Sequence, residues 1–446
     1  MPSEATEIKK YMRILKVQNS IKFFANFKFA MVILALIAIG SSLGSFIEQD
    51  QDITYYQETY PEKTPIYGFI NWKFIINFGL DSVYSTWWFL TLLFILAISL
   101  ITCSFIRQIP LLRISKEYFF KRKKNSFKSL PFSVKFPNVY FLKELILLKI
   151  EDMNFYIYQT NKLIYGYKGL IGRISPILVH ISLVLILLGS SIGAFKNFKA
   201  QEILPKGELF HIQNPIKIGS LTSLPNITTR VNDFWVEYEN NRIHQFYSSL
   251  SILDEYGNEL KTQTISVNNP LRYKNIDFYQ SDWNLLGIRI KKINENRVYE
   301  FPVFSIKKSS KNWISWIKNN NEDYTIIINK LENNFLIYDK NGNYIDIKNI
   351  NDTIDKNLLF LDVLPSTGLL IKYDPSIPII YLGFALLMIT TFLSYLPYTQ
   401  IWLFTQKKTC WLGGNTNRGK IQGEIQFENL IRYIENLILK RKFIQK

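Results

Sequence analysis

The chain has 446 residues, 48% of them apolar, and a formal net charge of +17 at pH 7. The apolar residues are concentrated in four windows of about 20 residues, the length that spans a bilayer as a helix. Most of the positive charge borders these windows, whereas nucleic-acid binding requires a clustered basic face on a soluble fold. These features exclude an ordinary soluble protein and argue against a nucleic-acid partner.

The chain begins with a basic segment, residues 1–28, in which residues 11–27 mix basic and apolar side chains. Such a mixture predicts a helix in the membrane interface. Residues 29–106 then contain two predicted spans, Phe29–Ile47 and Tyr84–Ile106, with a short acidic loop between them. No A-x-A cleavage site follows the first span, so we expect this span to be retained in the protein.

Residues 107–170 form a strongly basic loop that includes the run Lys121-Arg122-Lys123-Lys124. The positive-inside rule therefore places this loop and both termini on the side of synthesis, with the acidic loop on the opposite side. Residues 155–167 alternate aromatic and polar side chains around Asn161-Lys162. This pattern predicts a β-hairpin on the membrane surface.

Residues 171–195 form the third predicted span and residues 376–397 the fourth. The long segment between them, residues 196–375, shows period-two patterning with turn residues, which predicts a β-rich domain. Hairpins are expected at residues 251–260 and 334–347, and a β-branched strand at residues 324–330. The predicted fold is therefore a membrane protein with four transmembrane α-helices and a large β-rich extramembrane domain between the third and fourth spans.

Residues 398–446 form a basic tail in which apolar residues recur at helical spacing. This spacing predicts an amphipathic helix over Glu424–Lys442 that ends in Lys440-Arg441-Lys442. Membrane-surface packing and partner binding both fit such a helix, and we favour the membrane surface because basic residues attract anionic headgroups.

One histidine, His180, lies within the third span, seven residues after Arg173 and therefore about 10 Å from the basic boundary. Its helical neighbours are apolar, and burial of a polar ring without a hydrogen-bond partner costs free energy. The imidazole therefore needs a partner. The predicted spans contain no Asp, Glu or second His, which disfavours a proton relay and favours a haem or metal ligand. A bis-His site would then require a second protein. The alternative is a neutral imidazole bonded to a backbone carbonyl of a neighbouring helix.

The other reactive or unusual residues have simpler interpretations. His211 and His244 show no metal-ligand spacing, so we interpret them as surface or half-buried side chains. Trp87, Trp88 and Trp402 are expected at the membrane interface. Cys103 and Cys410 form no C-x-x-C motif, which excludes a thioredoxin-like reductant and a c-type haem carrier.

Two further stretches have an unusual composition: the first is rich in aromatic residues and the second in glycine and asparagine. "FYQSDW" (278–283) predicts a packed aromatic corner of the β-rich domain with Asp282 exposed. "GGNTNRGK" (413–420) lacks the full spacing of a phosphate-binding loop and does not follow a predicted strand, so we expect a structured loop.

Several stretches taken together resemble the ResB/CcsB family of System II cytochrome c biogenesis proteins, particularly its plastid-encoded members. These are "CSFIRQIPLLR" (103–113), "KGLIGRISPILVHISLVLILLGS" (168–190), "QEILPKGELF" (201–210), "NIDFYQSDW" (275–283), "LPYTQIW" (396–402) and "GGNTNR" (413–418). The resemblance covers nearly the full length, and the combination is specific although each stretch alone is modest.

The resemblance implies a subunit that binds haem b transiently in the membrane and presents it to apocytochrome c. His180 matches the family's intramembrane histidine, an axial ligand of the haem iron opposite a histidine of the partner. That partner is a CcsA/ResC-type membrane protein with a Trp-rich haem-handling motif. This motif is absent here, since Phe89 and not Asp follows Trp87-Trp88, so no catalytic residue is assigned and attachment is expected in the complex.

The resemblance also implies a multi-pass protein of the plastid thylakoid membrane, with the large domain in the lumen. A bacterial plasma membrane or a cyanobacterial thylakoid is the expectation for a chain that is not plastid-encoded. A different class of function stays open, namely a membrane-anchored assembly scaffold with no haem ligand of its own. A secondary transporter is disfavoured because the chain shows neither inverted repeats nor broken helices.

Overall fold

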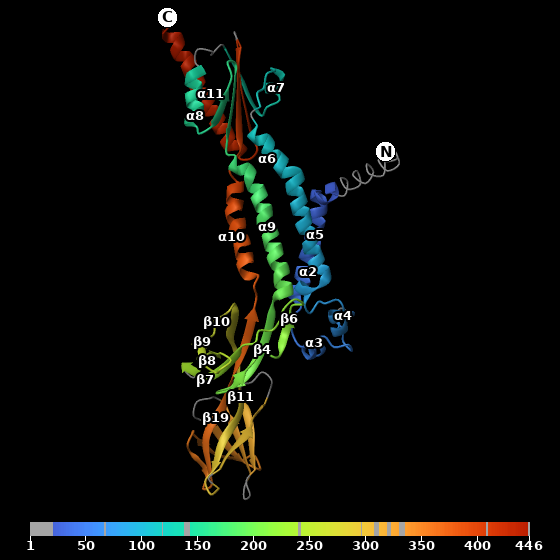
Figure 1. Cartoon of the computed structure of the whole chain (residues 1–446), viewed down its shortest axis with the longest axis vertical. Coiled ribbons are helices and arrows are strands. Elements are labelled where there is room, and N and C mark those ends of the chain that lie inside the picture. The colour runs from blue at the N-terminus through green and yellow to red at the C-terminus, as the bar shows by residue number, and fades with distance from the viewer. Residues whose placement is uncertain are drawn as a thin grey trace, which may run out of the picture. The chain divides into compact units, whose positions relative to one another are not determined.

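A computed structural model of the chain describes residues 21–66, 68–117, 119–137, 143–239, 242–295, 297–306, 312–318, 323–329, 335–406 and 409–444 (Figure 1). The chain divides into two compact units. We call residues 1–47, 82–191 and 376–446 the membrane unit, and residues 48–81 and 192–375 the β unit. The interfacial helix predicted for residues 11–27 lies largely outside the described residues.

Four helices among the described residues are long and apolar enough to cross a membrane, which confirms the predicted spans. They are α2 (Phe27–Phe46), the continuous helix Trp87–Lys116, α9 (Ile171–Lys196) and α10 (Ile377–Ser394). A helix satisfies its backbone groups internally, and this is why apolar segments of this length adopt it in lipid. The chain enters α2 through Asn26, whose side-chain oxygen accepts a hydrogen bond from the backbone N–H of Lys28 at 3.0 Å.

The second membrane helix extends beyond its predicted end at Ile106. It follows a short 3-10 segment, η1 (Val83–Ser85), and consists of α5 (Trp87–Cys103), the π-helical segment η2 (Ser104–Gln108) and α6 (Ile109–Lys116). Pro110 stands directly after the π-helical turn and cannot donate a backbone hydrogen bond to the preceding turn. The helix therefore widens there instead of continuing in regular α geometry.

Helices α9 and α10 approach each other closely at two glycines. A Cβ atom on Gly189 would lie 2.7 Å from the side chain of Ile380, and one on Gly383 would lie 2.7 Å from that of Ile186. Small residues allow this approach, and van der Waals packing then holds the helices together within the apolar phase.

The basic loop and the tail together build one small domain, which we call the basic-side domain (residues 119–168 and 398–444). Its sheet has the strand order β1-β21-β20-β3-β2 and is wholly antiparallel. The elements are α7 (Asn125–Lys128), β1 (Phe132–Pro137), α8 (Lys143–Asp152), β2 (Tyr156–Gln159), β3 (Leu163–Lys168), β20 (Thr399–Thr405), β21 (Thr409–Thr416) and α11 (Lys420–Ile444). The hairpin predicted at residues 155–167 is confirmed as β2–β3 and forms one edge of this sheet.

Both faces of this sheet are covered. Residues of a strand point alternately to opposite sides, so each face contributes its own set of side chains to the packing. Ile401 and Leu403 of β20 pack with Leu430 and Ile434 of α11 in one apolar cluster. Trp402 and its neighbours pack on the other face with Phe127 of α7. Figure 1 shows α8 and α11 along one side of the strands and α7 along the other.

This packing corrects three predictions made from the sequence. The amphipathic helix is present, but its apolar residues lie in the domain core and not on a membrane surface; the side chains of residues 440–442 lie outside the description. Trp402 is 4% exposed and belongs to that core, so it is no interface anchor. Residues 413–416 belong to strand β21 and not to a loop.

The two adjacent glycines of β21 have a packing role. A Cβ on Gly413 would lie 2.4 Å from the side chain of Leu130, and one on Gly414 would lie 2.9 Å from the ring of Phe427. Because these neighbours lie on opposite faces of the sheet, both positions must lack a side chain. Close packing, and not phosphate binding, therefore explains the glycine pair.

The β unit confirms the predicted β-rich domain between the third and fourth spans. Its strands are β4 (Phe198–Pro205), β5 (Leu209–Phe210), β6 (Pro215–Ile218), β7 (Thr228–Glu239), β8 (Arg242–Leu253), β9 (Glu259–Ser266), β10 (Leu271–Tyr273), β11 (Ile276–Lys292), β12 (Arg297–Pro302), β13 (Phe304–Ser305), β14 (Trp313–Lys318), β15 (Asp323–Ile328), β16 (Phe335–Asp339), β17 (Tyr344–Lys348), β18 (Thr353–Asp355) and β19 (Leu358–Tyr373). The predicted hairpins are confirmed as β8–β9 and β16–β17, and the predicted β-branched strand as β15.

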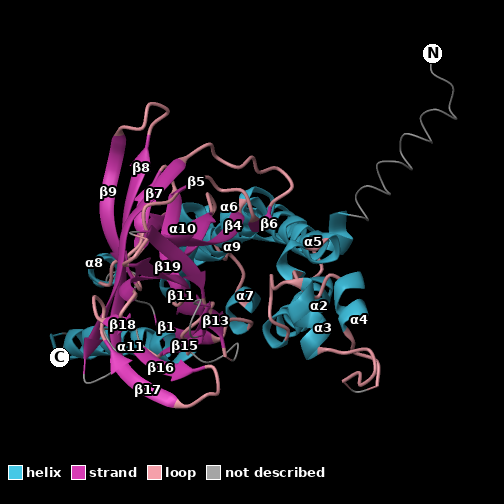
Figure 2. Cartoon of the chain, turned by 90° about the horizontal axis from the view of Figure 1, so that it is seen from below, coloured by secondary structure: helices cyan, strands magenta, loops and turns pink. Residues whose placement is uncertain are grey.

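Three sheets share two apolar cores in this unit. The largest has the order β10-β11-β19-β4-β6, with β12 and β18 attached at β11 and β19. One core joins it to the sheet β5-β7-β8-β9, whose strands β7, β8 and β9 are neighbours in Figure 2. The other core joins it to the sheet β13-β14-β15-β16-β17. In "FYQSDW" the aromatic residues Phe278 and Trp283 are buried while Asp282 is exposed, as predicted.

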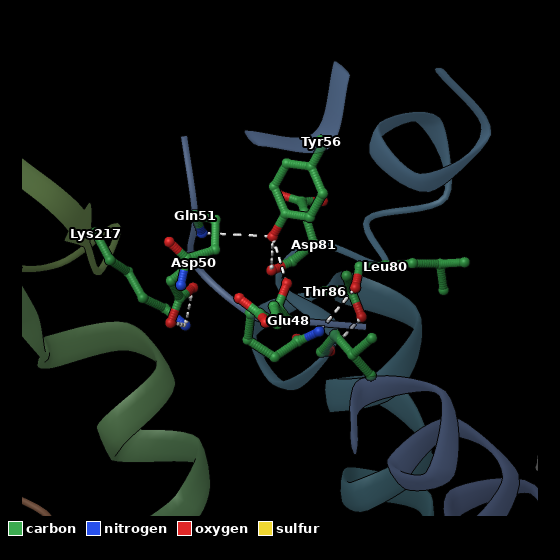
Figure 3. A network of polar contacts seen from close by, with 10 residues as sticks. Glu48, Asp50, Gln51, Tyr56, Leu80, Asp81, Thr86 and Lys217 are labelled. Atoms are coloured by element: carbon green, nitrogen blue, oxygen red, sulfur yellow. Dashed lines mark hydrogen bonds and ion pairs between the residues drawn. The ribbon is translucent and has the colours of Figure 1, made fainter. Parts of the chain in front are cut away.

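The acidic loop, residues 48–81, also belongs to the β unit and contains α3 (Ile53–Thr59) and α4 (Trp72–Asn77). Figure 3 shows a network of polar contacts around this loop. The buried Tyr56 donates its hydroxyl hydrogen to the backbone oxygen of Glu48 at 2.5 Å. Lys217 of β6 forms an ion pair with Asp50 at 2.9 Å, with only about a fifth of each side chain exposed (20% and 19%). The ion pair thus connects the loop to β6, and the hydrogen bond of Tyr56 lies within the loop.

Candidate functional site

His180 is half-buried in α9 and faces the helix formed by α5 and η2. Three residues of that helix contact the imidazole, namely Leu100, Ser104 and Gln108. They are spaced four residues apart, which places them on one helix face. The widened turn of η2 carries the two side chains among these partners, so the irregular backbone and the histidine contacts coincide.

The hydrogen bonds determine which ring nitrogen carries the proton. Nδ1 of His180 lies 3.2 Å from the backbone oxygen of Leu100 and 3.0 Å from Oγ of Ser104. The Ser104 hydroxyl itself donates to the Leu100 oxygen at 2.9 Å, so the remaining donor to that oxygen is Nδ1–H. Nε2 then bears the lone pair and accepts from the amide nitrogen of Gln108 at 3.2 Å.

This arrangement has a direct chemical meaning. A histidine that ligates a metal commonly donates its other ring N–H to a backbone carbonyl or carboxylate, which fixes the tautomer and raises the basicity of the ligating nitrogen. His180 has that carbonyl in Leu100, and its lone pair points toward a neutral amide. Nε2 is therefore the ring nitrogen that a metal would bind, once the Gln108 amide had withdrawn.

His180 could be predicted from the sequence, but its side-chain partners Ser104 and Gln108 were not predicted. The sequence left open either a ligand or an imidazole bonded to a backbone carbonyl, and Leu100 supplies that carbonyl. A signal for Ser104 and Gln108 was available, because two polar residues four apart at the end of an apolar helix, just before a proline, indicate a facing polar group. The missing information was which helix they face.

The other two histidines lie in the β unit and are exposed, as predicted. Nδ1 of His211 lies 3.4 Å from Oγ1 of Thr228, and Nδ1 of His244 lies 3.2 Å from a carboxylate oxygen of Glu239. Within the described part of the chain, no group of three or more His, Cys, Asp or Glu side chains could hold a metal ion. A metal site built by this chain alone is therefore not found among those residues.

The tryptophans and cysteines fall into different environments. Trp87, at the start of α5, is 80% exposed and fits the predicted interface position. The ring of Trp88 lies close to Gly40, where an added Cβ would be 3.1 Å from it. Cys410 is buried in the basic-side domain, and burial raises the pKa of its thiol to about 12. The thiol is thus neutral at physiological pH and behaves as a small core residue.

The chain belongs to the ResB-like family, whose model matches residues 27–352 and 337–428. Among its relatives, the cytochrome c biogenesis protein Ccs1 of Thalassiosira pseudonana is 43% identical over 422 residues, which cover 93% of this chain and 100% of that protein. Ccs1 of Phaeodactylum tricornutum is 42% identical with the same coverage of both chains. Ccs1 of Porphyra purpurea is 40% identical, covering 91% of this chain and 93% of that protein.

Proposed function

We propose that the chain acts in cytochrome c biogenesis by binding haem b within the membrane and presenting it to apocytochrome c. The role in biogenesis is supported by the names of the relatives, which match this chain over most of its length. Haem binding is supported by one observation above all: the Leu100 carbonyl holds Nδ1 of His180 as a donor, which leaves Nε2 as the ligating nitrogen.

The residues of this chain would hold the cofactor as follows. Bound haem would supply an iron centre that imidazole ligates well. His180 would provide one nitrogen ligand, Leu100 would keep its ring oriented, and the amide of Gln108 would rotate away from Nε2. The surrounding apolar side chains of α5 and α9 would exclude water from the site.

The second axial ligand would come from another protein. The chain has three histidines, and the other two are outside its spans. A CcsA/ResC-type, Trp-rich haem-handling membrane protein would supply the second imidazole and complete thioether formation. By the positive-inside rule the basic-side domain would face the side of synthesis. The β unit would then face the opposite side, the lumen of a plastid thylakoid, where it would meet apocytochrome c.

The test is to co-express the chain with such a partner, purify the complex and record its absorption spectrum. His180→Ala should lose the bis-His haem spectrum and recover it when imidazole is added. Ser190→Ala is the matched control, because Ser190 lies on the same helix and donates only to the local backbone oxygen of Ile186. Full wild-type haem content in the His180→Ala complex would refute the proposed ligand.

A second candidate function is a membrane-anchored assembly scaffold. The observation in its favour is that both ring nitrogens of His180 have partners within the chain, which satisfies the imidazole without haem. The substitution His180→Gln separates the two functions, since glutamine can keep polar contacts to Ser104 and Gln108 but is a poor iron ligand. Retained cytochrome c maturation in His180→Gln cells would favour the scaffold.

A further inference from the structure

A cavity of about 290 Å³ lies in the membrane unit beside the His180 site. Its lining comes from three segments of the chain: Gln108 from η2, Arg173 and Pro176 from the first turns of α9, and Asn417 and Arg418 from the segment after β21. Two arginines thus line one small space at the basic end of the spans. No carboxylate lines this cavity within the described residues.

The two arginines are held in place but their charges are not neutralised. The guanidinium of Arg173 lies over the ring of Tyr398 at 5.0 Å, and its Nε is buried without a hydrogen-bond partner. Arg418 donates to the backbone oxygen and the hydroxyl of Ser394. No ion pair joins either arginine to a carboxylate in the described part of the chain. A buried donor that lacks a hydrogen-bond partner costs free energy. An acceptor group of a bound ligand would remove this cost.

Gln108 connects this cavity to the imidazole. Its amide nitrogen contacts Nε2 of His180, while its Oε1 is buried without a partner and the residue also lines the cavity. Arg173 and His180 are seven residues apart on one face of α9, which separates them by about 10 Å along the helix axis. A ligand with a metal at its centre and acidic groups at one edge would meet both features together.

We propose that Arg173 and Arg418 bind the propionate carboxylates of the haem whose iron His180 ligates. This inference rests on the proposed haem-binding function and adds the orientation of the macrocycle, with its acidic edge toward the basic side. Guanidinium groups bind carboxylates through paired, charge-assisted hydrogen bonds, and Arg173 has a free donor for this purpose. Withdrawal of the Gln108 amide from Nε2 would open the path between the cavity and the imidazole.

The experiment compares haem with its dimethyl ester, in which both carboxylates are blocked and the iron is unchanged. The full-length chain, co-purified with its Trp-rich partner and stripped of haem, is placed in nanodiscs of zwitterionic lipid and titrated with each compound. Only the Soret absorbance that disappears in a parallel His180→Ala complex is counted. The wild-type complex should bind the free acid about tenfold to a hundredfold more tightly than the ester.

The arginine variants test whether Arg173 and Arg418 produce the preference for the free acid over the ester. Arg173→Gln and Arg418→Gln should lose this preference for the acid while their affinity for the ester stays unchanged. Arg107→Gln is the matched control, because Arg107 is an exposed cation at the same boundary that does not line the cavity. Since the acid-to-ester ratio is also measured on the wild-type complex, the result does not depend on the folding of the arginine variants.

Three results would overturn the inference, and they differ in meaning. Equal binding of acid and ester by the wild-type complex refutes the arginine site but leaves His180 as a ligand. Loss of the preference when anionic phosphatidylglycerol replaces the zwitterionic lipid assigns the arginines to a lipid headgroup. Absence of any His180-dependent absorbance with either compound refutes the proposed function itself.

Discussion

The basic-side domain and the acidic loop both join segments that are distant in the sequence, but through different interactions. In the basic-side domain, strands β20 and β21 lie between β1 and β3, and apolar residues of α11 complete the core. In the β unit, the ion pair of Asp50 and Lys217 connects the acidic loop to β6, while the hydrogen bonds of Tyr56 hold the loop itself together.

The difference predicts different sensitivities. Apolar burial is non-directional, whereas an ion pair depends on both charges, and removal of one leaves the other without its partner. The basic-side domain should therefore open only when its core is damaged. The acidic loop should respond to charge changes that leave every apolar contact intact.

The largest effect is expected from Leu430→Ala in α11, where the side chain is fully buried. Removing it leaves a cavity and should cost about 2 to 5 kcal/mol. The buried thiol of Cys410 reports opening of this domain, since it reacts with maleimide only when exposed. In a Cys103→Ser background, Leu430→Ala should raise the labelling rate at least about thirtyfold.

Ile425→Ala is the control for that substitution, because Ile425 lies on the same helix and is 54% exposed. It should leave the labelling of Cys410 unchanged. If both substitutions accelerated labelling equally, the apolar face of α11 would not be part of the domain core.

A smaller effect is expected from Lys217→Ala in β6. The substitution leaves the largely buried carboxylate of Asp50 without its partner and should cost about 2 kcal/mol. Limited proteolysis within residues 48–81 should therefore be faster in the variant than in the wild-type protein.

The control for the ion pair is Lys73→Ala, whose partner is Glu62 at 2.9 Å. That pair is far more exposed, with 57% and 45% of the two side chains accessible, so its loss should be nearly silent. Adding Asp50→Asn to Lys217→Ala should restore part of the lost protection. A double variant as labile as the single one would show that the pairing itself contributes little.

The smallest effect concerns two exposed turns with the same design, at Asp254 and Asp339. Each carboxylate accepts hydrogen bonds from an asparagine side chain and from backbone N–H groups, and these bonds lower its pKa below the ordinary value of 3.8. A lowered pKa in the folded state adds stability above the unfolded value, and this stability is lost as pH falls through the folded one. Both turns should therefore loosen below about pH 4.

Hydrogen exchange of the β8–β9 turn tests this dependence against Asp254→Asn, which cannot titrate. Wild type should be better protected than the variant at pH 5, and the difference should shrink as the pH falls below 4. Comparison at each pH cancels the intrinsic exchange rate. A difference that persisted in acid would mean that the carboxylate charge is not responsible.

Much of the fold could be predicted because its signals are local. The four spans follow from uninterrupted apolar windows, and the hairpins at Gly257 and Gly342 follow from alternation around turn residues. His180 could be singled out because a polar ring in an apolar helix is costly wherever that helix packs. Each of these conclusions depends on a few neighbouring residues.

The errors arose where the meaning of a residue depends on distant partners. Trp402 after a membrane span suggested an interface anchor, but its ring packs on that of Tyr165 in a buried cluster, and its Nε1–H donates to the backbone oxygen of Phe119. Gly413 and Gly414 suggested a loop, although they belong to strand β21. Side chains on both faces of the sheet pack closely against them. Composition and spacing alone do not reveal such neighbours.

The sequence by itself determined how many segments can enter a membrane, where charge would keep loops out of it, and that one imidazole would need a partner. Local length, charge and hydropathy suffice for those conclusions, because they depend on whether a segment is more stable in water or in lipid. Only the tertiary structure decided that Leu100, Ser104 and Gln108 surround His180 and that Arg173 and Arg418 share one cavity. These groups come from separate helices and from the segment after β21, and packing alone brings them within hydrogen-bond distance or around a common space.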